Sequence, residues 1–389
     1  MTNQTNFINR LLKHDSIGGV VLIGCVVISL GIANSGLMLP YNHLLNLPIG
    51  SDFGSVHLQY PIISWINDGL MAIFFLFVGL EIKREILNGE LSNIKNASLP
   101  VFAAIGGMLV PALIFTALNH HTPTAHGWGI PMATDIAFAI AILSLLGKSV
   151  PLSLKIFLKA LAIVDDLGAI IVIALFYTTG INMQYLLIAG GIFMLQLAFN
   201  YLGVKHLAFY VIPGAFLWYF IHGSGIHATV AGVLTAFAIP THTDDRSSAL
   251  LKLEHWLDIP VNFIIIPLFA LANTNIHFEW DVIIKGLTSP LGLGIIAGLL
   301  LGKPIGITLF SWMAVKTKLS ALPKDTNWHQ LWGAGQLGGI GFTMSIFITL
   351  ISLHQAILHD ESKLAILIAS ITTALTGYLL LKRKGQKPI

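Results

Sequence analysis

The stretch LSLKIFLKALAIVDDLGAIIVIALFY, residues 152–177, decides the fold class of this chain. It is long enough to cross a bilayer, which takes roughly 20 residues, and two adjacent carboxylates, Asp165 and Asp166, lie near its middle. A third carboxylate, Asp135, lies in the preceding hydrophobic segment. A charge at bilayer depth costs about 2.5–3.5 kcal/mol on insertion scales. Carboxylates kept at that cost are candidates for binding protons or small cations.

The composition of the whole chain agrees with a membrane protein. Of its 389 residues, 55% are hydrophobic and only 10% are charged, whereas a soluble domain carries about 25% charged residues. Cys25 is the only cysteine, so a disulfide within the chain is excluded, and no Cys/His cluster has the spacing of a zinc site. The sequence predicts an all-α polytopic membrane protein with lipid around it, no cofactor and no nucleic-acid partner.

Hydrophobic runs divide the chain into about twelve spans. They cover residues 16–36, 61–83, 97–118, 125–146, 153–177, 182–202, 206–221, 226–240, 259–276, 290–315, 329–352 and 361–381. With this division, 18 of the 21 Lys and Arg residues fall on one side of the membrane. Only Lys285 and Lys363 fall on the other side, and Lys303 lies within a span. By the positive-inside rule this split predicts that both termini are cytoplasmic.

Two of the spans are interrupted by helix-breaking residues. The fourth has Pro131 just before Thr134 and Asp135, and the eleventh contains five glycines between residues 333 and 341. Each is the middle member of a three-span group, spans 3–5 (about 97–177) and 10–12 (about 290–381). Matched interruptions of this kind indicate inverted repeats whose two broken helices, 4 and 11, cross at mid-membrane around a transport site. The simpler interpretation is that membrane helices tolerate Gly and Pro for close packing.

Broken helices leave charged ends inside the membrane, and two residues are placed to offset them. Half-helix N-termini are partly positive and C-termini partly negative. Asp135 is expected to offset the positive ends, and Lys303 either offsets the negative ends or pairs with a carboxylate of residues 153–177. A lysine can also snorkel to an interface, but Lys303 lies near the centre of its span.

The segment at about residues 45–58 is expected to form a small extracellular hairpin, because partial polar/apolar alternation and Gly turns occur there without Lys or Arg. Residues 244–258 mix leucines with charges, which favours an amphipathic helix at the cytoplasmic surface; the simpler interpretation is an ordinary polar linker. The whole chain, 1–389, is interpreted as a single transmembrane transporter domain.

Several motifs together resemble the NhaA-type bacterial Na⁺/H⁺ antiporters, which are themselves among the inverted-repeat transporters from which that general pattern was drawn. They are PMATDIAFA (131–139), AIVDDLGAI (162–170), GKPIGI (302–307), GGIGFTMS (338–345), GLEIKRE (79–85), HGSGIHAT (222–229) and LEHWL (253–257). The resemblance extends over essentially the whole chain. It implies an inner-membrane protein that exports Na⁺ or Li⁺ in exchange for external protons, electrogenically and with activation at alkaline pH.

The resemblance also assigns expected roles to individual residues. Asp166 and Asp165 would form the ion and proton site, with Asp166 as the stronger candidate for direct Na⁺ or Li⁺ ligand. Thr134 and Asp135 would lie at the helix break, and Lys303 would stabilise the assembly or carry a proton. The expected pH-response residues are Glu81, Arg84, Glu85, Glu254, His255 and His227. The hairpin at 45–58 would join two copies in a homodimer, and Asp258 stands where family members can carry a second histidine.

Two other classes of membrane protein remain as alternatives. A cation channel would also use acidic residues, but it would move ions without proton counterflow. An intramembrane protease would need a motif such as GxGD, GxSG with a histidine, or HExxH; the first and last are absent, and the stretch His222–His227 has the wrong spacing for the second.

Overall fold

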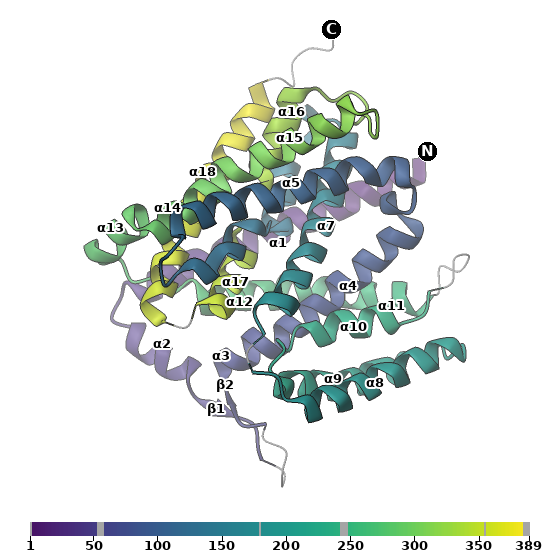
Figure 1. The fold of residues 1–389 in the computed structure, drawn as a ribbon, viewed down its shortest axis with the longest axis vertical. Coiled ribbons are helices and arrows are strands. Elements are labelled where there is room, and N and C mark those ends of the chain that lie inside the picture. Colours follow the sequence, from purple (N-terminus) through teal and green to yellow (C-terminus); the bar gives the residue numbers. More distant parts are fainter. Residues whose placement is uncertain (1, 53–57, 179, 242–247, 354, 384–389) are drawn as a thin grey trace. The chain divides into compact units, whose positions relative to one another are not determined.

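The chain is mostly helical (Figure 1). Its residues divide into two compact units whose segments alternate along the sequence. The computed structural model describes residues 2–52, 58–178, 180–241, 248–353 and 355–383, with the side chains of 2–16, 148, 282 and 383 left out. Unit 1 consists of Met1–Ile23, Gly89–Ala169 and Phe278–Ile389, and unit 2 of Gly24–Asn88 and Ile170–His277. Helices α1 (Thr2–Ala33) and α7 (Leu152–Phe176) each run from one unit into the other.

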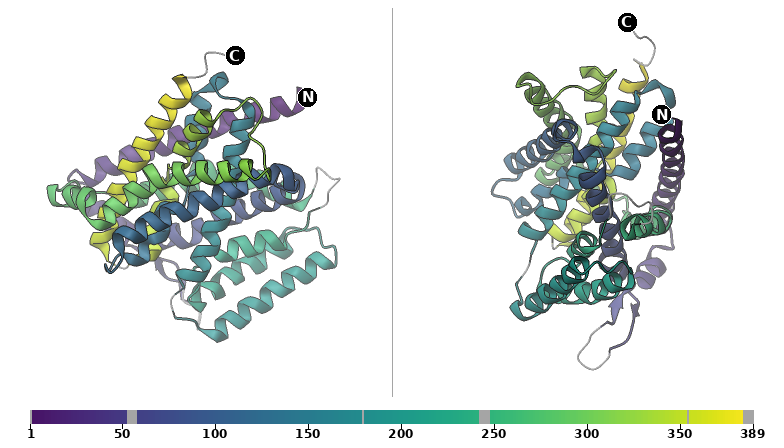
Figure 2. Two further views of the ribbon diagram at one scale, coloured as in Figure 1. Left: turned by 45° about the horizontal axis from the view of Figure 1, so that its top comes forward. Right: turned by 90° about the vertical axis from the view of Figure 1, so that its right-hand side faces the viewer.

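Unit 1 is built from long helices and short helical turns. Its elements are η2 (Glu90–Ser92), α5 (Ile94–Asn119), η3 (Ala125–Met132), α6 (Ile136–Leu145), η4 (Gly147–Ser149), α13 (Trp280–Thr288), α14 (Pro290–Ala297), η6 (Gly298–Gly302), α15 (Lys303–Lys316), α16 (Trp328–Gly338), α17 (Phe342–Ser352) and α18 (Ala356–Arg383). The π-helical segment η6 joins α14 to α15, and α5 lies alongside this continuous rod (Figures 1 and 2).

Helices α5 and α15 approach so closely that two glycines touch. A Cβ on Gly306 would lie 2.1 Å from the carbonyl oxygen of Gly106, and one on Gly106 would lie 2.2 Å from that of Gly306. Further along, Gly302 meets Pro111, so the two helices run antiparallel. Small residues allow such backbone contact between helices in a membrane, where close van der Waals packing drives association.

This contact gives a first testable prediction. Replacing Gly306 with Ala forces the two backbones apart, and we expect it to lower the free energy of unfolding by about 1–3 kcal/mol, as overpacking does. Gly190 on α8 has open space around it, so Gly190→Ala is the matched control and is expected to be neutral or stabilising. Thermal unfolding in detergent measures both, and equal stability of the two variants would contradict the close contact.

Two helical stretches of unit 1 are interrupted part-way along. Between η3 and α6 the backbone is extended, with ψ 148° at Ala133 and 98° at Asp135. Helices α16 and α17 are separated at Gly339–Gly341 and bent by 46°. The two interruptions meet, because the Asp135 amide donates to the Ile340 carbonyl at 2.6 Å. These are the stretches in which Pro131 and the glycine run interrupt the hydrophobic pattern.

Unit 2 packs helices around a second apolar core. Its elements are α2 (Met38–Leu45), β1 (Pro48–Ile49), β2 (Tyr60–Pro61), α3 (Ile62–Ser64), η1 (Trp65–Leu70), α4 (Met71–Asn88), α8 (Met183–Tyr201), α9 (Ala208–Ser224), α10 (Val230–Ala238), α11 (Ala249–Pro260), η5 (Val261–Ile265) and α12 (Ile266–Asn273). Leu80, Tyr210, Ala236 and Leu250 are buried together in this core.

Two further segments were expected to form a hairpin and an amphipathic helix. Strands β1 and β2 pair antiparallel, with Ile49 opposite Tyr60, and residues 53–57 of the expected hairpin lie outside the described residues. Helix α11 occupies the expected amphipathic segment, with Leu250 and Leu253 buried and Trp256 exposed, but it continues through η5 into α12, so that Ala249–Asn273 is one helix long enough to span a membrane. Residues 242–247 lie outside the described part of the chain.

Within the described residues, seven helices are long and apolar enough to cross a membrane, or nine if each of two bent pairs forms one span. The protein is therefore an all-α membrane protein. Three of the expected spans differ from a full-length apolar helix. Helix α7 carries four charged residues, α9 has 17 residues and α10 has 9, whereas a perpendicular span needs roughly 20. The count of twelve stays a prediction.

Candidate functional site

Polar side chains gather in the interior of unit 1, where the two interrupted segments meet. Asp135, Asp165, Asp166, Thr134 and Lys303 are all at most 2% exposed. They come from the extended backbone before α6, from α7 and from the start of α15. Five residues that are separated along the sequence by up to 169 positions therefore share one buried region. Burial of so many charged groups is expensive unless they are paired.

The carboxylate of Asp135 caps two helices at once. Its Oδ1 accepts from the Phe138 amide of α6 at 3.0 Å. Its Oδ2 accepts from the amide of Thr343 in α17 at 3.0 Å and from the Thr343 hydroxyl at 2.5 Å. Helix N-termini carry unpaired amides and partial positive charge. Asp135 thus offsets the positive ends of both α6 and α17, and its oxygens are already occupied by protein donors.

Loss of this double cap is expected to lower the free energy of unfolding. An N-cap is typically worth about 1 kcal/mol, so we expect Asp135→Ala to lower the unfolding free energy by roughly twice that amount. Asp135→Asn keeps an acceptor for one helix, so its unfolding free energy is expected to lie between those of the wild type and Asp135→Ala. The control is Asn327→Ala, which removes the capping box of α16 alone. Thermal unfolding in detergent compares the three, and an Asp135→Ala loss no larger than the Asn327→Ala loss would refute the double role.

Lys303 forms an ion pair with Asp165. Its ammonium donates to the Oδ2 of Asp165 and, at 2.7 Å, to the hydroxyl of Thr134. The Thr134 oxygen lies 2.6 Å from Asp165 Oδ2 and 2.8 Å from the carbonyl of Gly338, so its single proton serves one of these acceptors. Because Gly338 is the last residue of α16, Thr134 links the ion pair to the negative end of that helix.

The position of Lys303 follows from its local sequence. Pro304 has no amide proton and cannot complete the helical ladder, and the chain before it widens into the π-helical segment η6. Such single-turn π segments often occur at functional sites. On the other side, Gly107 lets α5 approach, with its Cβ position 3.8 Å from the Lys303 side chain. The lysine is therefore enclosed with its charge facing α7.

Two carboxylates of this region, Asp165 and Asp166, decide what it could bind. In the described part of the chain, the Oδ1 atom of buried Asp165 has no hydrogen-bond partner. Asp166 follows on the next position of α7 and also interacts electrostatically with Lys303. Carboxylates in a poorly solvated site accept either a proton or a hard cation. Among the described residues, no group of three His, Cys, Asp or Glu side chains is arranged to hold a resident metal ion.

The sequence-predicted pH-response residues separate into distinct places within unit 2. Arg84 joins three carboxylates, with its Nε 2.9 Å from Glu254, one terminal nitrogen 2.9 Å from Glu85 and the other 3.8 Å from Glu81. His255 is exposed on α11 beside Glu254. Four of these residues therefore form one cluster between the C-terminal half of α4 and the middle of α11.

His227 does not belong to that cluster. Its Nε2 lies 3.6 Å from an oxygen of Asp68 in η1, and its Nδ1 contacts the Thr229 hydroxyl at 2.9 Å. Lys83, which carries no predicted role, donates to the carbonyls of Phe237 and Ile239 at the end of α10, at 2.7 and 2.5 Å. A lysine at a helix C-terminus satisfies carbonyls that the helix leaves unpaired.

Comparison with known proteins identifies the family. The profile of the family described as Na⁺/H⁺ antiporter 1 matches residues 9–381. The chain belongs to this Na⁺/H⁺ antiporter family. It is similar to Na(+)/H(+) antiporter NhaA 2 of Flavobacterium johnsoniae, with 58% identity over 96% of this chain and 91% of the relative. It is also similar to the NhaA proteins of Flavobacterium psychrophilum (50% identity, 97% and 96% covered) and Escherichia coli (47%, 95% and 96%).

Membership confirms the resemblance drawn from the motifs. Na⁺/H⁺ antiporters are transporters rather than enzymes. The family's description names Na⁺ and H⁺ as the transported ions. Sequence reasoning missed Thr343 and the Gly338 carbonyl as partners of the buried carboxylates. The signal for Thr343 was its place directly after the glycine run, where a restarting helix exposes amides that need an acceptor.

Proposed function

We propose that this antiporter exports cytoplasmic Na⁺ or Li⁺ in electrogenic exchange for external H⁺, with activation at alkaline pH. The observation that carries the proposal is the buried Asp165–Lys303 ion pair next to Asp166, at the meeting point of two interrupted helical segments. A site that binds a cation and protons in turn needs carboxylates that no resident metal ion occupies. Asp166 is the proposed direct ligand, and Asp165 and the Thr134 hydroxyl supply further oxygens.

Exchange follows from competition for the same carboxylates. Na⁺ entering from the cytoplasm replaces the proton on Asp166 and draws Asp165 from its ammonium partner, and protonation from the other side releases the cation. The two adjacent carboxylates titrate as a coupled system. When Asp165 turns from Lys303 to the cation, the ammonium loses its partner and readily gives up a proton. Lys303 or Asp165 would then carry the second proton of each cycle.

The second proton makes the exchange electrogenic. If two protons enter for each Na⁺ that leaves, one net charge crosses the membrane per cycle, and the potential contributes about 2.3 kcal/mol per 100 mV. Spans 3–5 and 10–12 would act as inverted repeats that rock around the fixed site, with Asp135 keeping the two restarted helices together. The whole chain, 1–389, would then act as a single twelve-span transporter domain of the inner membrane, with cytoplasmic termini.

One assay tests this function against a cation channel. In everted vesicles with an established proton gradient, Na⁺ or Li⁺ is expected to collapse ΔpH between roughly pH 7 and 9, the range in which His and perturbed carboxylates titrate. Imposing a potential is expected to change the rate if exchange is electrogenic. Na⁺ flux that persists without any proton movement would identify a channel instead.

The Arg84 cluster is proposed to set the pH of activation. Removing the guanidinium leaves Glu81, Glu85 and Glu254 without their shared cation, and mutual repulsion then favours protonated forms. If activation needs these groups ionised, Arg84→Ala shifts the onset of exchange to higher pH, with the maximal rate largely kept. The pH profile of ΔpH collapse measures this shift. Lys252→Ala, an exposed charge on α11, is the control, and an unchanged Arg84→Ala profile would refute the role.

Dimerisation through the 45–58 hairpin is part of the same proposal. Antiparallel pairing of β1 and β2 leaves strand edges available for a second copy. Deleting residues 50–58 is expected to convert a dimer to a monomer in detergent, as measured by light scattering. A dimer that survives the deletion would place the interface elsewhere.

A further inference from the structure

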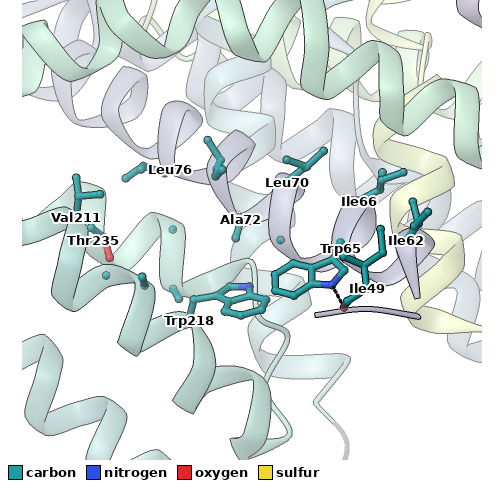
Figure 3. A pocket seen from close by; sticks show the side chains of 16 residues that line it. Ile49, Ile62, Trp65, Ile66, Leu70, Ala72, Leu76, Val211, Trp218 and Thr235 are labelled. Carbon is teal, nitrogen blue, oxygen red and sulfur yellow. Dashed lines mark hydrogen bonds between the residues drawn. The ribbon is translucent and has the colours of Figure 1, made fainter. Parts of the chain in front are cut away.

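Unit 2 contains a groove that transport does not explain. Its cavity has a volume of about 640 Å³ and lies between η1 and α4 on one side and α9 and α10 on the other (Figure 3). Small residues form much of its wall, among them Gly69, Ala72, Gly214 and Ala215. Larger apolar side chains such as Leu76 and Val211 mark one end, and Trp65, Trp218 and Ile49 mark the other. We call it the α4–α9 groove.

The walls of the α4–α9 groove offer almost no hydrogen bonds to a ligand. The indole N–H of Trp65 donates to the Ile49 carbonyl at 3.0 Å, as the dashed line in Figure 3 shows, and that of Trp218 donates to the Asp68 carbonyl at 3.1 Å. The Thr235 oxygen lies 3.4 Å from the Gln196 amide. Every other lining side chain is hydrocarbon or glycine. The groove therefore selects a hydrocarbon ligand.

The dimensions of the groove fit a single flexible chain. Its lining runs from Ile62 to Leu76, which at 1.5 Å per residue is about 21 Å of helix. A groove of about 640 Å³ over that length is long and narrow, which is the shape that an extended acyl chain fills.

One end of the groove has the character of a membrane interface. Trp65 stacks on Trp218, with ring centroids 5.8 Å apart, and Trp218 stacks on His222 at the same separation. The polar groups of Tyr60, Ser64 and Asp68 lie next to this stack. Tryptophan prefers the headgroup level of a bilayer. The groove thus runs from an interfacial end into the hydrocarbon region, which is the course of a lipid tail.

We propose that the α4–α9 groove binds one acyl chain of a bilayer phospholipid, with the headgroup at the Trp65–Trp218 end. An empty slot of this size would leave its lining without dispersion contacts, and the bilayer supplies hydrocarbon to fill it. The bound chain packs along α4, the helix whose other end carries Glu81, Arg84 and Glu85. This binding site is independent of the ion-exchange proposal.

Fluorescence quenching by brominated lipid tests the proposal. Seven of the eight tryptophans are replaced by Phe, leaving Trp218, and the full chain is reconstituted in phosphatidylcholine vesicles with or without bromine on the acyl chains. A second protein keeps only Trp312, which is 44% exposed on α15, as a reference for ordinary lipid contact. We expect brominated chains to remove more than half of the Trp218 emission, and at least as large a fraction as for Trp312.

Groove-filling variants make the assignment specific. Ala215→Phe, or Val211→Phe if the first does not fold, occupies the groove and is expected to lower Trp218 quenching severalfold. Ile212→Phe, an exposed neighbour on α9 outside the groove lining, is expected to leave it unchanged. Quenching of Trp218 that is weaker than that of Trp312, or that groove-filling does not reduce, would overturn the proposal. So would absent quenching together with a smaller dimer fraction in Ala215→Phe, because the groove would then be an interface between copies.

Discussion

Everted vesicles containing Asp166→Asn are expected to show no Na⁺- or Li⁺-induced collapse of ΔpH at any pH at which the wild type is active. Asn is nearly isosteric with Asp, so the buried position on α7 keeps its shape. The substitution removes both the negative charge that a hard cation requires and the group that takes up the competing proton. Loss of either one alone would stop exchange.

The control for this result is another aspartate of unit 1. Asp281 is exposed on α13, and Asp281→Asn is expected to exchange ions at the wild-type rate. Equal amounts of both variants in the membrane, and similar thermal midpoints, exclude a folding defect. Exchange retained by Asp166→Asn would show that Asp165 alone is the ligand, or that ion binding lies elsewhere.

Removing Lys303 is expected to have the largest effect on stability. Breaking a buried ion pair by deleting one partner typically costs about 3–5 kcal/mol, because the remaining charge stays buried without compensation. Lys303→Met keeps the apolar volume, so the cost reports the lost charge rather than a cavity. The exposed Lys285 on α13 is the matched control, and Lys285→Met is expected to change stability very little.

The two single variants of this pair are expected to depend on pH in opposite directions. In Lys303→Met, buried Asp165 must bind a proton that the unfolded chain releases, so stability falls as pH rises. In Asp165→Asn, buried Lys303 must release a proton that the unfolded chain keeps, so stability rises with pH. The double variant buries neither charge and is expected to recover much of the loss, without either trend. Thermal midpoints between about pH 6 and 9 measure this, a range between the ordinary pKa values of the two groups.

Parallel trends in both single variants would contradict a direct Lys303–Asp165 pair. So would additive losses in the double variant, because independent sites add and coupled ones do not. Either result would leave Lys303 as a partner of the α16 C-terminus through Thr134 and Gly338, the alternative that the sequence left open.

The placement of Asp135 shows what sequence reasoning could reach. A carboxylate four residues after Pro131 in a hydrophobic segment predicts a helix that stops and restarts, with positive charge to offset. The segment alone does not say that a second helix restarts at the same point. Thr343 is 208 positions away, and its contact with Asp135 exists only because α17 begins where α6 begins.

The partner of His227 could not be predicted from the sequence. The family motif places it among the pH-response residues, together with Arg84 and Glu254. Local sequence holds no information on which acid it meets, and the structure pairs it with Asp68 on η1 rather than with the Arg84 cluster. Side-chain partners of this kind depend on helix packing and not on spacing along the chain.

The sequence by itself determined that this is an all-α membrane protein of the Na⁺/H⁺ antiporter family, because hydrophobic length, charge distribution and motifs are local properties of the chain. Tertiary structure alone decided that Lys303 pairs with Asp165, that Asp135 caps two helices and that a hydrocarbon groove lies beside α4. Each of these depends on how closely separate helices approach, as at Gly106 and Gly306, and such distances are set by packing of the whole unit.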